Sequence, residues 1–220
     1  MKKLTVYLIR HGQTYYNIYG KLQGWGNSPL TEKGINDAIN AGKKLSNVKF
    51  AAAYCSDTTR AHDTAKKIVE LNQESNLTDN DIVVSPFFRE QFYGSFEGEN
   101  IHYVWEQVAM SHGMKNLRDI QEKYSLAKAK DLMKDTDPFH DSENNEEYWN
   151  RLNKGFDLIR SNNELSDGDN VLLVGHSNTI LSIVEKYGHG KYDVYHKPAN
   201  GSVTKLLLND KDIIIDSYNE

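Results

Sequence analysis

The 220-residue sequence has little of several features that would place it in particular protein classes. Its one cysteine, Cys55, excludes an internal disulfide framework, and its place in an apolar run indicates a buried strand residue. No stretch approaches the roughly 20 apolar residues that cross a bilayer. The apolar run at 4–9 is too short for a signal peptide and has no cleavage site of small residues. We therefore expect a cytoplasmic protein with no membrane partner.

An excess of basic residues is also lacking. A formal net charge of −5 argues against non-specific binding of nucleic acid, which needs a basic surface. It does not exclude a small anionic ligand, because a local cluster of arginines can outweigh a mildly acidic surface. With only 4 prolines and no repeats or low-complexity tracts, the composition is that of an ordinary globular protein with room for a substantial core.

Strands and helices are predicted to alternate along most of the chain. Apolar runs, several rich in β-branched residues, predict strands at 4–9, 51–55, 82–84, 171–174, 203–208 and 213–215. Apolar residues at helical spacing predict helices around 35–45, 59–71, 149–159 and 180–184. Thr31 is the expected cap of the first helix, with Ile35 facing inward. The last two strands are expected to form a closing hairpin, and the whole pattern predicts an α/β fold: a three-layer α/β/α sandwich with a mostly parallel sheet.

The segment at 94–145 interrupts this alternation. It is polar and partly helical, and it carries the aromatic residues Tyr103, Trp105, Tyr124 and Phe139. Because it is too short for a core of its own, we interpret it as a cap insert over the end of the sheet. The domain prediction is thus one α/β domain, 1–220, with the cap insert at 94–145 inside it.

Charged and titratable side chains follow the ends of the predicted strands. The first strand leads directly into Arg10 and His11, and the fourth leads into His176. Arg60 lies at the start of the helix after the second strand, and Glu90 follows the third. Ligands of open α/β sheets bind beyond the carboxyl ends of the strands, so the two histidines can meet across one crevice.

These residue types suit phosphoryl transfer. A phosphate ester is an anion, and planar guanidinium groups can each bind two of its oxygens and stabilise the charge that develops. A neutral imidazole can attack phosphorus and form a phosphohistidine, which divides one difficult displacement into two easier ones. A nearby carboxylic acid can protonate the leaving oxygen and later deprotonate the attacking water.

The order of the motifs resembles that of the histidine phosphatase superfamily, also called phosphoglycerate mutase-like proteins. The matching segments are Arg10-His11-Gly12-Gln13-Thr14 with Asn17, Gln23-Gly24-Trp25, 29–34, 56–61, Glu90 before 93–98, Gly175-His176-Ser177 and 200–203. An Arg-His-Gly triplet alone carries little information, whereas this ordered set over nearly the whole chain is specific. The sequence departs from the family at 175–178, where many relatives have Ser-His-Gly, and at Thr59, which is commonly aliphatic. Neither departure removes a catalytic group.

The resemblance implies a role for each matched position. His11 would be the nucleophile and Glu90 the proton donor, while Arg10, Arg60 and His176 would hold the phosphoryl oxygens. Further substrate contacts are implied for Thr14, Asn17, Gln23 and the backbone N–H of Ser177. The substrate class is a small-molecule phosphomonoester. No metal and no other cofactor is implied, because the arginines supply the positive charge.

Other readings of the same residues are weaker. Residues 174–179 mimic the nucleophile elbow of an α/β-hydrolase, but Thr179 replaces the closing glycine and only a short tail remains for the other catalytic residues. His62-Asp63 mimics the metal-binding pair of HD phosphohydrolases, but no further ligands at suitable spacing are evident. A non-catalytic protein that binds phosphorylated ligands would be expected to lack the nucleophile or the acid, and neither is missing.

Within the family, the phosphoryl group passes either to water or to a second hydroxyl. A mutase holds a bisphosphorylated intermediate, and we expect it to need additional basic residues above the site to bind the second phosphate. The stretch 91–99 contains no lysine or arginine. The expected rim is aromatic instead: Tyr15, Tyr16, Tyr19, Trp25, Phe92, Tyr93 and Phe96. We therefore expect a phosphatase, with phosphoglycerate mutase-type transfer as the alternative and the oligomeric state left open.

Overall fold

A six-stranded sheet forms the centre of the computed structural model, which describes residues 2–220. The strands are β1 (Leu4–Arg10), β2 (Phe50–Cys55), β3 (Ile82–Val84), β4 (Asn170–Gly175), β5 (Val203–Leu208) and β6 (Ile213–Ser217). Their order is β3-β2-β4-β1-β5-β6. The first four strands of this order pair in parallel, and β5 is antiparallel to both β1 and β6. The predicted strands and the closing hairpin at the sheet edge are confirmed.

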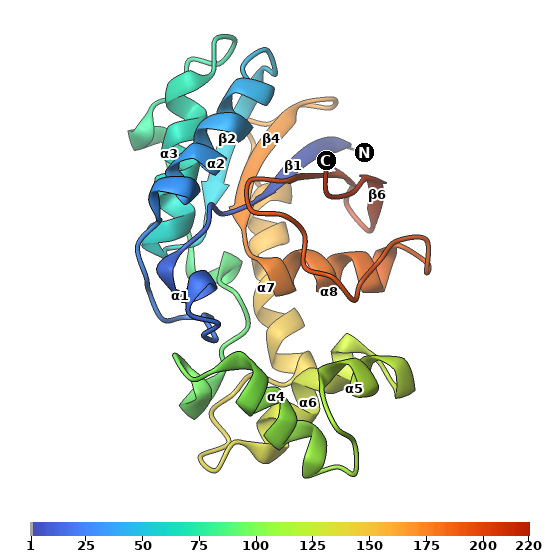
Figure 1. The fold of residues 1–220 in the computed structure, drawn as a ribbon. Coiled ribbons are helices and arrows are strands. Elements are labelled where there is room, and N and C mark those ends of the chain that lie inside the picture. The colour runs from blue at the N-terminus through green and yellow to red at the C-terminus, as the bar shows by residue number, and fades with distance from the viewer. Residues whose placement is uncertain (1) are drawn as a thin grey trace.

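Helices cover both faces of the sheet (Figure 1). The helices of the described chain are α1 (Tyr15–Ile18), α2 (Glu32–Lys44), α3 (Thr59–Leu71), α4 (Ile101–Met110), α5 (Leu117–Lys123), α6 (Leu126–Thr136), α7 (Asn145–Arg160) and α8 (Ser177–Tyr187). Buried residues of α2 and α3 form one apolar cluster with the sheet, and those of α7 and α8 form a second cluster with it. This is the predicted three-layer sandwich. None of the helices described is long and apolar enough to cross a membrane.

The first turn of α2 packs directly against the chain after β1. Thr31 caps the helix as predicted, accepting a hydrogen bond from the Gly34 N–H at 3.0 Å. A Cβ atom on Gly34 would lie 2.0 Å from the Gln13 carbonyl oxygen, so only glycine permits this approach. The inward position predicted for Ile35 is wrong: the residue is 42% exposed, because small residues form the buried face of α2.

The segment between Gly12 and Pro29 is partly ordered by its own hydrogen bonds. It contains the one-turn helix α1, which begins after Thr14. The Thr14 side chain accepts from the Asn17 N–H, while the Asn17 side chain accepts from the Thr14 N–H at 3.1 Å. This reciprocal capping satisfies backbone groups that a loop would leave to water.

Helices α4, α5 and α6 lie beyond one end of the sheet (Figure 1). They enclose an apolar cluster in which Val108, Ala109, Ile120, Ala129 and Met133 have no exposed surface. The segment does not form this cluster alone. Leu22 and Tyr93, from outside the helices, complete the cluster. The description of the chain as a single domain with a cap insert stays a prediction.

Candidate active site

His11 lies directly after β1 and is 4% exposed. Its Nδ1 is 2.7 Å from the carbonyl oxygen of Gly12. Because a carbonyl only accepts, this contact places the proton on Nδ1 and leaves the lone pair on Nε2. Burial, followed by the charges of Arg60 and Arg10, lowers the pKa of His11 well below 6.5. The imidazole is therefore neutral at pH 7, which is the state a nucleophile needs.

Arg10, at the end of β1, lines the same cavity as His11. Its Nη1 donates to the carbonyl of Pro198, and its buried Nε has no hydrogen-bond partner among the residues described. Burial lowers the pKa of Arg10 to about 10, so the guanidinium is still charged at neutral pH. A charged group with an unused donor in a cavity can bind an anion.

Arg60, in the first turn of α3, is fully buried and is not among the residues that line this cavity. It donates to the carbonyls of Gly24 and Gly26 at 2.7 and 2.8 Å, and its Nη2 lies 3.2 Å from Nδ1 of His176. Burial lowers its pKa to about 10. Arg60 thus fixes the backbone at 24–26 and orients His176, in addition to adding positive charge beside His11.

His176 meets His11 as the strand ends predicted, because Arg10 of β1 pairs with Gly175 of β4. The two imidazole centroids are 5.3 Å apart. Nδ1 of His176 accepts from Arg60, so its Nε2 carries the proton and donates to Ser56 Oγ at 2.8 Å. Both ring nitrogens therefore have protein partners, and one of these bonds would have to open for His176 to bind a phosphoryl oxygen.

Glu90 is 4% exposed and lines the cavity. Its Oε1 accepts from the Gln91 N–H and the Thr179 hydroxyl, both at 3.0 Å, and its Oε2 accepts from the Asn178 N–H at 2.7 Å. Burial raises the pKa of Glu90 above 4.5, against the opposing effect of these donors. A raised pKa shifts a carboxyl toward its protonated form, which is the form that a general acid requires.

Asn178 and Thr179 were missed as partners of Glu90 at the sequence level. They lie in the first turn of α8, directly after His176 and Ser177. The motif comparison assigned roles only to those two residues. Asn178 and Thr179 could have been predicted from the expected start of a helix after His176. The first N–H groups of a helix have no partner within it and can bind a carboxylate.

The predicted contact residues divide into two groups. Asn17, Gln23 and Ser177 line the cavity with His11. Gln23 Nε2 and Ser177 Oγ are buried without a hydrogen-bond partner among residues 2–220. Thr14 is not among the lining residues. Its hydroxyl donates to Gln23 Oε1 at 2.7 Å, and this bond orients the amide so that its Nε2 is left to donate to a ligand.

The predicted aromatic, weakly charged rim is wrong in most of its members. Of the seven residues expected there, only Tyr93 is among those that line the cavity. Trp25 stacks on Phe92 with ring centroids 4.6 Å apart, and the other rings also lie elsewhere. The outer cavity is lined instead by Lys21 and Lys197 and by cap and loop residues, among them Ile101, Trp105, Leu117, Leu126 and Tyr195. Neither lysine was predicted to line the site, because both lie far from Glu90 in the sequence and belong to separate loops.

The alternative sites gain no support. The Ser177 hydroxyl has no hydrogen-bond partner in the described chain, so no general base contacts it as in an α/β-hydrolase. His62 pairs with Asp79 at 3.3 Å on the outside of α3. No three His, Cys, Asp or Glu side chains gather as a metal site within residues 2–220. These observations leave the cavity beside His11 as the candidate site.

Together, the fold and the site define a class: a three-layer α/β protein with a buried neutral histidine, an arginine and a carboxyl gathered at the carboxyl ends of parallel strands. The sequence model of the histidine phosphatase superfamily (branch 1) matches residues 6–220. The chain belongs to this superfamily, as its motifs predicted.

Individual relatives include both mutases and a phosphatase. The 2,3-bisphosphoglycerate-dependent phosphoglycerate mutase 2 of Gloeobacter violaceus is 30% identical over 223 residues, covering 94% of this chain and 92% of that protein. The fructose-2,6-bisphosphatase TIGAR of Xenopus laevis is 42% identical over 99 residues, which are 44% of this chain and 35% of that protein. Alignments with other phosphoglycerate mutases span only 57% of those relatives' length.

The fold comparison agrees. The crystal structure of a phosphoglycerate mutase from Bacillus anthracis str. Sterne superposes with a TM-score of 0.90 at 31% identity, over 100% of this chain and 94% of that one. The α/β prediction is confirmed by this similarity.

Proposed function

We propose that the chain is a phosphatase that hydrolyses phosphomonoesters through a phosphohistidine on His11. The observation that carries the proposal is the state of His11: neutral, buried, and with its Nδ1 proton bound to the Gly12 carbonyl. In the first step, Nε2 of His11 attacks phosphorus, the ester P–O bond breaks, and protonated Glu90 gives its proton to the leaving oxygen. In the second, Glu90 deprotonates a water that attacks phosphorus, and the P–N bond breaks to release phosphate.

The polar lining of the cavity supports an anionic substrate. Arg10 Nε, Gln23 Nε2 and Ser177 Oγ all lack a partner among the described residues, and all three residues line the cavity beside His11. Buried donors without partners are costly, and a phosphoryl group with several acceptor oxygens would satisfy them. In this proposal the charge of Arg60 helps to lower the pKa of His11, and His176, which Arg60 orients, lies beside the His11 ring.

A second candidate is phosphoglycerate mutase-type transfer, and the two outer lysines favour it. Glu90 is the only acidic residue lining the described cavity, whereas Arg10, Lys21 and Lys197 line it with positive charge. Lys197 has exposed surface, but nearby protein atoms partly desolvate its ammonium group and, together with the neighbouring Arg10, lower its pKa. A leaving group with its own carboxylate or phosphate would be attracted to these lysines.

The experiment is a panel of phosphomonoesters assayed for phosphate release in the presence of EDTA, with phosphoglycerate mutase activity measured in parallel. We expect phosphate release that EDTA leaves unchanged, and its loss in His11→Ala. His62→Ala, on the outside of α3, is the matched control and should keep full activity. Isomerisation of phosphoglycerate without net phosphate release would replace this proposal with the second candidate.

A further inference from the structure

The backbone that carries Glu90 has no regular secondary structure. Residues 89–93 lie between the short 3-10 helices Pro86–Phe88 and Gly94–Phe96. Glu90 itself is 4% exposed, so hydrogen bonds to solvent contribute little to holding its side chain in place. A general acid has to stay within hydrogen-bond reach of the leaving oxygen, and a displacement of about 1 Å can cost about 100-fold in rate. Some other part of the molecule must therefore hold this segment.

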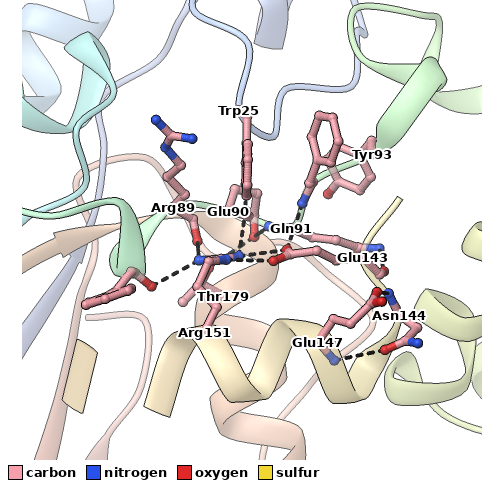
Figure 2. Close-up of polar contacts among 12 residues, drawn as sticks. Trp25, Arg89, Glu90, Gln91, Tyr93, Glu143, Asn144, Glu147, Arg151 and Thr179 are labelled. Atoms are coloured by element: carbon pink, nitrogen blue, oxygen red, sulfur yellow. Dashed lines mark hydrogen bonds and ion pairs between the residues drawn. The ribbon is translucent and has the colours of Figure 1, made fainter. Parts of the chain in front are cut away.

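Arg151 of α7 binds three backbone carbonyls here, two in this segment and one in the 3-10 helix before it (Figure 2). Its Nη1 donates to the carbonyls of Phe87 and Arg89 at 3.0 and 2.9 Å, and its Nη2 donates to the carbonyl of Glu90 at 3.0 Å. The Trp25 indole N–H donates to the same Glu90 carbonyl at 3.1 Å. The guanidinium thus replaces the hydrogen bonds that a helix or strand would supply.

Glu143 holds both Arg151 and the far end of the segment. Its carboxylate accepts from Arg151 Nε and Nη2 at 2.6 and 2.8 Å, and its Oε2 also accepts from the Phe92 N–H at 2.9 Å. The two side chains are only 12% and 11% exposed, so water screens this pair weakly. The pair therefore binds carbonyls at 87–90 and an N–H at 92, on either side of the Glu90 side chain.

One helix sets the position of both partners. Asn144 caps α7 and exchanges hydrogen bonds with Glu147, which fixes the chain directly after Glu143 (Figure 2). Arg151 follows two turns along the same helix. Gln91 adds two further links: its Nε2 donates to the Glu143 carbonyl at 3.2 Å, and its Oε1 accepts from Asn178 Nδ2 of α8 at 2.9 Å.

We propose that Arg151, held by Glu143, is a positioning residue for the proton transfer by Glu90. The inference rests on the proposed function, because it assumes that Glu90 is the acid. Arg151 does not line the cavity and touches no reacting atom. It acts through the backbone, by keeping the Glu90 carboxyl against Asn178 and the cavity.

The test uses the leaving group as the readout. An alkyl phosphate leaves as a basic alkoxide that needs the proton, whereas p-nitrophenyl phosphate needs it much less. In single-turnover phosphorylation, Arg151→Met should slow the alkyl ester by about 30-fold or more and p-nitrophenyl phosphate by less than about 3-fold. Arg151→Lys should restore part of the alkyl rate. Arg160→Met, on the same helix but bound to the Asn209 carbonyl, is the control and should change neither rate.

A double variant makes the test specific. If Arg151 acts only through Glu90, then Arg151→Met should add little once Glu90→Gln is present, because the proton is already lost. Glu143→Gln should give the leaving-group contrast in weaker form, and it decides the question if Arg151→Met does not fold.

Two outcomes would overturn the inference. Equal slowing of both esters, or effects of Arg151→Met and Glu90→Gln that multiply, would make Arg151 a structural residue while leaving the proposed function intact. Absence of the leaving-group contrast in Glu90→Gln itself would remove the proposed acid, and the role of Arg151 with it.

Discussion

Replacing Arg60 by methionine should lower both stability and activity, because this side chain holds a loop as well as the site. The change removes the donor from the carbonyls of Gly24, which is buried, and Gly26, which is half-buried. Each orphaned buried acceptor costs about 1–3 kcal/mol. No carboxylate forms an ion pair with Arg60 in the described chain, so removing its charge offsets part of this cost. A net loss of about 3 kcal/mol should lower Tm by about 6–12 °C in a chain of this size.

The comparison with Arg10→Met separates anchoring from catalysis. Arg10 binds one described backbone carbonyl, that of Pro198, and lines the cavity, so its replacement should change Tm by only a few degrees. Both variants should lower kcat/KM by about 100-fold or more, since each removes positive charge beside the phosphoryl group. Calorimetry and steady-state assays measure the two quantities. An Arg60→Met variant with an unchanged Tm would refute the anchoring role, and one with unchanged kcat/KM would remove Arg60 from the site.

Further predictions follow from buried groups with lowered pKa values. The folded protein keeps His11 and His176 neutral, so below pH 6.5 only the unfolded chain binds protons at these two side chains. The free energy of unfolding should therefore fall by up to about 1.4 kcal/mol per pH unit for each histidine. Urea unfolding between pH 7 and 5 measures this slope, which His11→Asn should reduce. Lys130 is buried against Ser182, with its pKa lowered to about 8, and its charge therefore costs about 3 kcal/mol at pH 7. Lys130→Met should raise Tm at pH 7 and abolish the gain in stability between pH 8 and 10.5; a lower Tm would show that its hydrogen bond outweighs the buried charge.

Strand patterning predicted the inner part of the site. Two apolar runs ending in histidines were enough to bring His11 and His176 together, because neighbouring parallel strands end at the same edge of a sheet. Which face of α2 is buried was not predictable from hydrophobicity, since close packing there selects small residues over Ile35.

The outer site and the supports of Glu90 were beyond the reach of the sequence. Lys21 and Lys197 are far apart in the chain, and their meeting depends on how two loops fold over the cavity. Arg151 donates to three backbone carbonyls, and because every residue has a carbonyl, the sequence does not indicate which ones it binds. Such contacts depend on tertiary geometry and not on the local period of the sequence.

The central claim is a covalent phosphohistidine at His11, and trapping it is the most direct test. The protein is mixed with a phosphomonoester, quenched within the first turnover at alkaline pH, and digested for mass spectrometry. The account predicts phosphate on His11 that is lost in acid and stable in base, and none in His11→Ala. Steady phosphate release with no labelled histidine, or with the label on another residue, would contradict it.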